Sequence, residues 1–399
     1  MPLDFNPYPM PILDGLGFPI KVGPFNQLVT GEEHPTVQWK AGHPVLDTVN
    51  DFNVTTPVGS GSVSVAGGHL IVSTGTTAGS SARVETIDPM IYRTGQGSAC
   101  RFTFPMIPPT ANGTIKVGPH ITTDGFAVGF QGTTLGLWHI NNSTTTFIPQ
   151  SSWNGDKLDG SGPSGATFNP LYGTPFEINY QWLGYGVVLF LAYFGRVPYI
   201  IHTLDWGNTA TDTVTRVASL PIGLEVTNGT AAANVQIRTP SLYACNIGKV
   251  TGASWKAFSS TLPYAAFNTS EDIIGIFRVD DTFGAVTNRT VVRPINLSVG
   301  NGGTRAEIRI YKTRDTASFS GATFAAFNAL SCMSSASTAT IVSQTNWVQI
   351  AGRGVGADGE TDIDLTGRSL YRGDHLIVTG RTGSGTSQGT PTLDVMEDR

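Results

Sequence analysis

Short segments of alternating apolar and polar residues, each bounded by glycine, asparagine or threonine, constrain this chain more than any other feature. In one of them Phe176, Ile178, Tyr180 and Trp182 alternate with Glu177, Asn179 and Gln181. Because successive side chains of a β-strand point to opposite faces of a sheet, this period of two predicts a strand with one buried face. Several segments of the same kind predict an all-β protein.

Two further segments predict a hairpin and a buried strand. Phe126, Val128 and Phe130 alternate, and Leu135 and Leu137 follow the turn Gly132-Thr133-Thr134, which is typical of a hairpin. The nearly all-apolar run from Val187 to Tyr193 lies between Gly186 and Gly195. Its length suits a buried central strand better than a helix.

The composition agrees with strands joined by tight turns. The chain has 48 glycines, and charged residues make up 13 % of it against about 25 % in an average protein. Lys and Glu, which populate exposed helix faces, are scarce. With 40 % hydrophobic residues among 399, the chain can bury the cores of two or three domains.

Charge and cysteine content exclude several classes of partner and site. The net charge is -5 and no basic patch occurs, so we do not expect nucleic acid as a partner. Cys100, Cys245 and Cys332 are odd in number and lack a CxxC motif, so we expect buried hydrophobic side chains rather than disulfides. The first residues lack the basic region of a signal peptide, and the longest apolar run is too short to span a bilayer. We therefore expect a protein made in a cytosol, without membrane contact.

Three regions differ in their pattern. Residues 1–48 are rich in proline, which denies helix and favours extended backbone. Residues 49–248 contain the repeated strands and turns that are typical of a jelly-roll β-sandwich. Residues 255–399 contain a further series of alternating segments and predict a second, smaller β-domain.

The N-terminal region predicts an extended arm that docks onto another subunit or a neighbouring domain. Its prolines and apolar residues cannot form a core of their own, and a floppy tail is the alternative interpretation. The residues expected to anchor the arm are Pro2, Phe5, Pro7, Tyr8, Pro9, Met10, Ile12 and Phe18.

A set of motifs between Ala82 and Arg238 resembles a family of bacteriophage virion proteins. A Tyr-x-x-Gly turn precedes a strand, a Trp-x-x-Asp-x-x-x-Gly-x-Gly-x-Ser-Gly loop comes next, and a Gln-Trp-Leu-Gly strand end follows. The matching residues are Tyr92, Gly95, Trp153, Asp156, Gly160, Gly162, Ser164, Gly165, Gln181, Trp182, Leu183 and Gly184. The C-terminal segment from Gly373 onward is similar to the closing hairpin of that family.

This resemblance implies a concanavalin-like jelly-roll sandwich, a smaller β-sandwich domain after it, and often a homotrimer. Such proteins sit on phage particles as capsid decoration or cement proteins, head or neck fibres, or tail-associated adhesion proteins. The partners it implies are copies of this chain, the major capsid, collar or tail proteins of the virion, and for an adhesin a host-surface glycan. The expected location is the virion, after synthesis in the cytoplasm of the host bacterium.

The loop from Trp153 to Gly165 admits two interpretations. Its four glycines permit tight turns, and Asp156 and Asp159 can cap local amides, which together predict a rigid structural Ω-loop. A carbohydrate or cation site at Asp156 is the alternative. Tyr185, in the turn between Gly184 and Gly186, is a further candidate for contact with a ligand or a protein.

Patterns that could carry catalysis have simpler explanations. Glu360, Asp362 and Asp364 share a strand face as in laminarinase-type glycoside hydrolases, but a solvated edge strand explains them as well. Asp156 and Asp159 are spaced for turn caps rather than for acid–base work across a glycosidic bond. The seven histidines are scattered singly, so we expect no metal site, and Arg372-Gly373-Asp374 is explained by a hairpin turn.

Together with these patterns, the resemblance implies a non-enzymatic virion structural protein that uses no cofactor or metal. A capsid decoration protein or a head or neck fibre subunit is the first interpretation. A tail-associated adhesin that recognises host-surface glycans is the alternative, and a glycan hydrolase is the third hypothesis.

Overall fold

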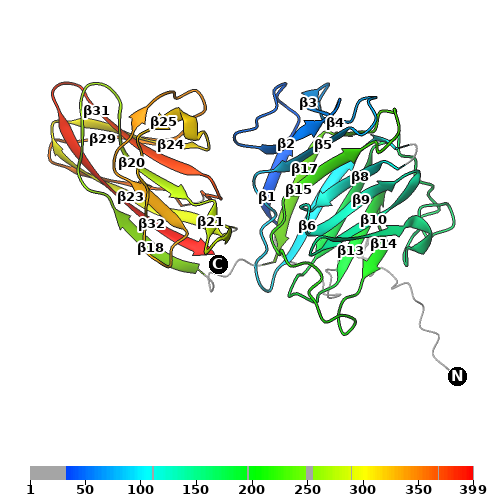
Figure 1. Cartoon of the computed structure of the whole chain (residues 1–399). Coiled ribbons are helices and arrows are strands. Elements are labelled where there is room, and N and C mark those ends of the chain that lie inside the picture. Colours follow the sequence, from blue (N-terminus) through cyan, green and yellow to red (C-terminus); the bar gives the residue numbers. More distant parts are fainter. Residues whose placement is uncertain are drawn as a thin grey trace. The chain divides into compact units, whose positions relative to one another are not determined.

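The protein folds into two compact units of antiparallel β-sheet, Met1–Val250 and Thr251–Arg399 (Figure 1). The structure is a computed structural model and describes residues 33–398 apart from 110–111, 196, 249–254, 289 and 367. Its described residues contain no α-helix, only the short 3-10 helices η1 (Gln150–Ser152) and η3 (Thr316–Ser318). The predicted all-β fold class is confirmed.

The first unit is a sandwich of two large sheets. The six-stranded sheet has the order β1 (Glu33–Lys40), β17 (Ser241–Ile247), β6 (Gly97–Phe104), β12 (Thr174–Tyr180), β13 (Val188–Phe194) and β14 (Val197–Leu204). The seven-stranded sheet has the order β11 (Thr144–Pro149), β10 (Thr134–Asn141), β9 (Gly125–Gln131), β8 (Thr114–Pro119), β15 (Ile222–Thr227), β5 (Ser81–Thr86) and β2 (Phe52–Val58). A smaller sheet has the order β3 (Ser62–Ala66), β4 (His69–Ser73), β16 (Gln236–Thr239) and β7 (Met106–Ile107).

The core of this sandwich lies between the two large sheets. Alternate residues of facing strands point inward, so Phe126 of β9 meets Tyr180 of β12 and Phe190 of β13, with ring centroids 5.5 and 6.3 Å apart. All three rings are fully buried. The predicted strand over Val187–Tyr193 and the predicted hairpin of β9 and β10 are both present. Cys100, Cys245 and Cys332 are free and buried, as predicted.

The end of the predicted N-terminal arm needs correction. Glu33–Lys40, which we assigned to the arm ending at residue 48, forms β1 and pairs with β17 in the six-stranded sheet. The partner strand lies about two hundred residues further along the chain, so no local pattern reveals the pairing. The anchoring residues proposed for the arm, between Pro2 and Phe18, lie outside the described residues.

The second unit is a smaller sandwich. One sheet has the order β18 (Trp255–Thr261), β32 (Ser387–Asp398), β23 (Val291–Gly303) and β30 (Glu360–Asp364), and β19 (Ala265–Phe267) also pairs with β32. The other has the order β26 (Ala325–Ala326), β27 (Met333–Ala336), β20 (Asp272–Val279), β31 (His375–Thr382), β24 (Ala306–Thr313) and β29 (Val348–Val355). Two short pairs complete it, β21 (Thr282–Phe283) with β22 (Val286–Thr287) and β25 (Phe319–Ser320) with β28 (Thr340–Ile341). The residues between 316 and 337 form η3 and three of these strands.

Candidate functional site

The loop of residues 153–165 closes one side of the first sandwich. It follows β11 and η1 and runs along β14, the edge strand of the six-stranded sheet, where the amides of Gly155 and Asp156 donate to two backbone carbonyls. The side chains of Trp153 and Leu158 belong to the sandwich core. The loop therefore covers an open strand edge and joins the two sheets.

Asp156 holds this loop in shape. Asp156 is 2 % exposed, and its two carboxylate oxygens accept hydrogen bonds from the backbone amides of Leu158 (2.9 Å) and Ser164 (2.6 Å). A Cβ atom at Gly162 would lie 2.2 Å from Asp156 Oδ1, so a larger residue there would displace the carboxylate. Asp156 thus caps the loop from within, which is the geometry of a structural Ω-loop.

Asp159 lies on the outside of the same loop. It is exposed and accepts hydrogen bonds from the backbone amide (2.9 Å) and hydroxyl (2.5 Å) of Ser161, which lower the pKa of its carboxyl. Gly160 and Gly165 have φ of +87° and +62°, a conformation that glycine adopts without strain. A glycosidase acid needs a raised pKa, so Asp159 does not fit that role.

A second feature is the loop of residues 181–187 between β12 and β13, called here the hairpin tip. The ring of Trp182 packs edge-on against Tyr92, with centroids 5.5 Å apart, and the Leu183 amide donates to the Tyr92 hydroxyl at 3.3 Å. The Gly186 amide donates to the Trp182 carbonyl at 3.0 Å. Two motifs of the family resemblance, which lie ninety residues apart in sequence, therefore form one structure.

The hairpin tip is also tied to residues 205–217. The Trp182 indole donates to the Thr215 carbonyl at 2.7 Å, and the Val214 amide donates to the Gly184 carbonyl at 2.8 Å. The hydroxyl of Tyr185 donates to the Thr211 carbonyl at 2.8 Å. Contacts with two other segments thus fix the position of the tip.

Two apolar side chains of the hairpin tip are presented to solvent. Leu183 is 52 % exposed and Tyr185 is 43 % exposed. Leu183 also has a φ of +34°, a backbone conformation that residues other than glycine rarely adopt. Strain of this kind persists only where surrounding contacts hold it, and it concentrates at functional sites.

The acidic residues of β30 lie on a solvated edge. Glu360, Asp362 and Asp364 occupy the exposed positions of the strand, and β30 ends the order of its sheet. Asp362 accepts hydrogen bonds from Ser298 (2.5 Å) and Asn296 (3.2 Å), and these bonds lower its pKa. Carboxyls with lowered pKa stay ionised at neutral pH and do not supply the proton of a glycosidase acid.

The Arg372-Gly373-Asp374 tripeptide forms a turn before β31. Gly373 has a φ of +78°, and the Asp374 carboxylate is fully buried. That carboxylate accepts the Tyr371 amide at 2.8 Å and pairs with Lys312 at 2.8 Å. An integrin-type contact would need this carboxylate in solvent, so the geometry does not fit one.

The structure contains two ionic networks that no pattern in the sequence predicts. On the seven-stranded sheet Arg83 donates to Glu225 (2.7 Å) and Glu85 (3.0 Å), and lies 3.0 Å from Nε2 of the buried His120. Because a guanidinium only donates, Nε2 accepts and Nδ1 carries the proton, 3.0 Å from the Gly118 carbonyl. Burial, together with the charge of Arg83, lowers the pKa of His120 to about 3.

The second network lies on the six-stranded sheet. Arg101 makes two hydrogen bonds to Glu33, at 2.8 and 2.6 Å, and one at 2.6 Å to the fully buried Glu177. Tyr193 donates to Glu177, and Tyr243 donates to Glu33 at 3.0 Å. Only strand pairing brings these side chains together. The alternation in the sequence predicted one buried face for β12, but Glu177 and Asn179 on the opposite face are buried as well.

Among the described residues, no group of three or more His, Cys, Asp and Glu side chains gathers as metal ligands would. In the same part of the chain, no helix combines the length and hydropathy needed to cross a membrane.

Comparison with known proteins returned structures alone. No family model and no curated protein matches the sequence. Among solved structures, the legume lectin-like domain from Entamoeba histolytica is 9 % identical and covers 49 % of this chain and 89 % of its own, with a TM-score of 0.31. A lectin from Bauhinia forficata in complex with GalNAc is 13 % identical (54 % and 99 %, TM-score 0.33), and an endo-β-1,4-glucuronan lyase from Trichoderma reesei is 14 % identical (52 % and 96 %, TM-score 0.32).

Proposed function

We propose that this chain is a non-catalytic structural subunit of a bacteriophage particle, a decoration protein or a head or neck fibre, that acts by docking onto copies of itself and onto neighbouring virion proteins. The observation that supports it is the hairpin tip. Motifs shared with the phage family, at Tyr92 and at Gln181 to Gly184, build a fixed loop that presents Leu183 and Tyr185 to solvent. Tyrosine is among the residues that most often anchor protein interfaces, and here it stands on a fixed support.

The backbone at Leu183 strengthens this proposal. A left-handed conformation costs a residue other than glycine about 1–2 kcal/mol, and a glycine at this position would remove that cost. A leucine there contributes little to the core, since half of its side chain is exposed. Its side chain is therefore better explained by a contact with a partner than by folding.

Particle composition tests the proposal. Particles are assembled from the genome that encodes the chain, with the chain supplied as wild type, as the double variant Leu183→Ser/Tyr185→Ser, or as the control Tyr264→Ser, whose tyrosine is exposed in the second unit. Mass spectrometry of purified particles should find the wild type and the control, and at least about tenfold less of the double variant, as expected when interface anchors are lost. Absence of the wild-type chain from particles would overturn the virion assignment, and full incorporation of the double variant would overturn the role of the hairpin tip.

A second candidate function is that of a tail-associated adhesin for host-surface glycans. Tyr185 favours it, because the hydroxyl is used within the protein while much of the ring faces solvent, as a platform for stacking a sugar requires. Binding of the purified chain to host cells, reduced in Tyr185→Ser and competed by the host polysaccharide, would favour this candidate over decoration of the head. A chain that decorates the head without binding cells would exclude it.

A further inference from the structure

The second unit contains a hollow at one end of its six-stranded sheet, which the proposed docking function does not use. It has a volume of about 520 Å³, within the range of roughly 300–1,000 Å³ that is common for ligand sites. Its walls come from three adjacent strands, β29, β24 and β31, and from the turns that follow β19, β23 and β31. The residues that line it are Thr269, Thr304, Arg305, Ala306, Glu307, Gly354, Arg381, Thr382, Gly383 and Ser384.

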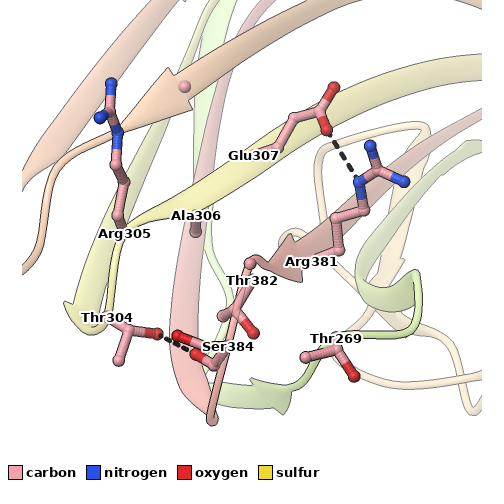
Figure 2. Close-up of a pocket in the computed structure, with 10 residues that line it drawn as sticks. Thr269, Thr304, Arg305, Ala306, Glu307, Arg381, Thr382 and Ser384 are labelled. Carbon is pink, nitrogen blue, oxygen red and sulfur yellow. Dashed lines mark hydrogen bonds and ion pairs between the residues drawn. The ribbon is translucent and has the colours of Figure 1, made fainter.

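Two arginines flank this hollow. Figure 2 shows Arg305 on one side and Arg381 on the other, with Ala306 and Thr382 between them. Within the described residues Arg305 makes no hydrogen bond or ion pair. Arg381 donates from Nε to Glu307 at 2.8 Å, and its two terminal nitrogens have no partner in that part of the chain. Both guanidinium groups therefore have donors that remain available to a ligand.

Glu307 gives one of these arginines a defined orientation. Its carboxylate accepts Nε of Arg381 through one oxygen and Nε of Arg309 through the other, at 2.8 and 2.9 Å. The pKa of Glu307 is lowered by these hydrogen bonds, that from Arg309 first, so the carboxylate stays charged and keeps the terminal nitrogens of Arg381 directed away from it. A guanidinium held in this way is prepared to bind a carboxylate with both terminal nitrogens.

The floor of the hollow is open and polar. A Cβ atom at Gly354 or Gly383 would meet nothing within 4 Å. The hydroxyls of Thr304 and Thr382 donate hydrogen bonds to carbonyls of the neighbouring turn. The hydroxyls of Thr269 and Ser384 have no partner among the described residues. Ala306 is the one apolar side chain of the lining. Such a surface suits a hydrated ligand with many hydroxyl groups and does not suit an apolar one.

We propose that this hollow binds an acidic oligosaccharide, with one carboxylate at the guanidinium group of Arg305, another at that of Arg381, and the sugar hydroxyls at the open hydroxyls of Thr269 and Ser384. The lining contains two arginines and one carboxylate, so its net positive charge complements the negative charge of an acidic sugar. Because the guanidinium groups are exposed, the attraction is screened by salt, and affinity should fall as the salt concentration rises.

Calorimetric titration of the full chain with oligogalacturonate tests the inference. Neutral malto-oligosaccharides of the same length and inorganic phosphate serve as the other two probes. Oligogalacturonate should bind, Arg305→Gln should weaken binding about tenfold, as the loss of one charge-assisted hydrogen bond predicts, and neutral sugars should bind at least tenfold more weakly. Arg372→Gln is the matched control, because Arg372 also lacks a partner among the described residues but precedes β31, whereas the hollow lies at the other end of that strand.

A second variant fills the hollow without touching its charges. Gly354→Leu adds a side chain where the structure has open space, so the fold should be retained while saccharide binding is lost. Equal affinity of wild type, Arg305→Gln and Gly354→Leu would overturn the site. If neutral sugars bind as tightly as oligogalacturonate, the proposed specificity for acidic sugars is wrong. If phosphate binds and oligogalacturonate does not, the assignment of the ligand as a saccharide is wrong. The presence of the chain on phage particles is measured separately, so neither result decides the other.

Discussion

Asp156 offers the sharpest test of how the loop of residues 153–165 is held. In Asp156→Ala the backbone amides of Leu158 and Ser164 lose their acceptor. Asp156 is 2 % exposed, so water replaces its carboxylate poorly, and each unsatisfied buried donor costs about 1–3 kcal/mol. Allowing for partial relaxation of the loop, we expect the free energy of unfolding of the first unit to fall by about 3 kcal/mol.

Urea denaturation followed by tryptophan fluorescence measures this loss. Five of the seven tryptophans lie before residue 250, so the signal reports mainly on the first unit. With a denaturant slope of about 2–3 kcal/mol per molar, a loss of 3 kcal/mol moves the midpoint down by about 1 M. Asp159→Ala is the matched control, because Asp159 is exposed and caps only Ser161, and we expect a clearly smaller shift. Equal midpoints for Asp156→Ala and Asp159→Ala would refute the internal cap.

Three further predictions follow from single residues. Histidine has a pKa of about 6.5 in an unfolded chain, whereas that of His120 in the folded protein is about 3. The neutral His120 therefore contributes its full stability above pH 6.5, and this contribution is lost as the pH falls, because the unfolded chain then binds a proton that the folded protein does not. Between pH 7 and pH 5 the free energy of unfolding should fall by about 2 kcal/mol more in wild type than in His120→Gln, and equal falls would contradict the prediction. Gly129→Ala places a Cβ atom 1.9 Å from the Ile115 carbonyl oxygen and should cost about 3 kcal/mol in a urea melt, whereas Gly354→Ala meets no atom and should melt like wild type. Leu183→Gly relieves the left-handed backbone and should raise the unfolding free energy by about 1 kcal/mol while it lowers incorporation into particles; a loss of stability would show that the leucine packs rather than docks.

Local patterns in the sequence determined the class of the fold. The alternation over Phe176–Tyr180 and the hairpin turn at Gly132 predict strands that the structure contains, because a period of two and a turn preference act over a few neighbouring residues. The low content of charged helix formers likewise predicts an all-β chain. The paired aspartates predict turn caps, and Asp156 and Asp159 both cap amides of their own loop.

Only the tertiary structure decided which distant segments meet. The pairing of β1 with β17, the contact of Tyr92 with Trp182 and the burial of Glu177 beside Arg101 depend on strand order. Strand order follows from packing of the whole core and leaves no local periodicity at any one of these positions. The hollow of the second unit is lined by residues spread from position 269 to position 384, and no stretch of sequence contains enough of them to form a motif. Contacts between residues close together along the chain could therefore be predicted from the sequence. Contacts between residues on different strands could be identified only from the tertiary structure.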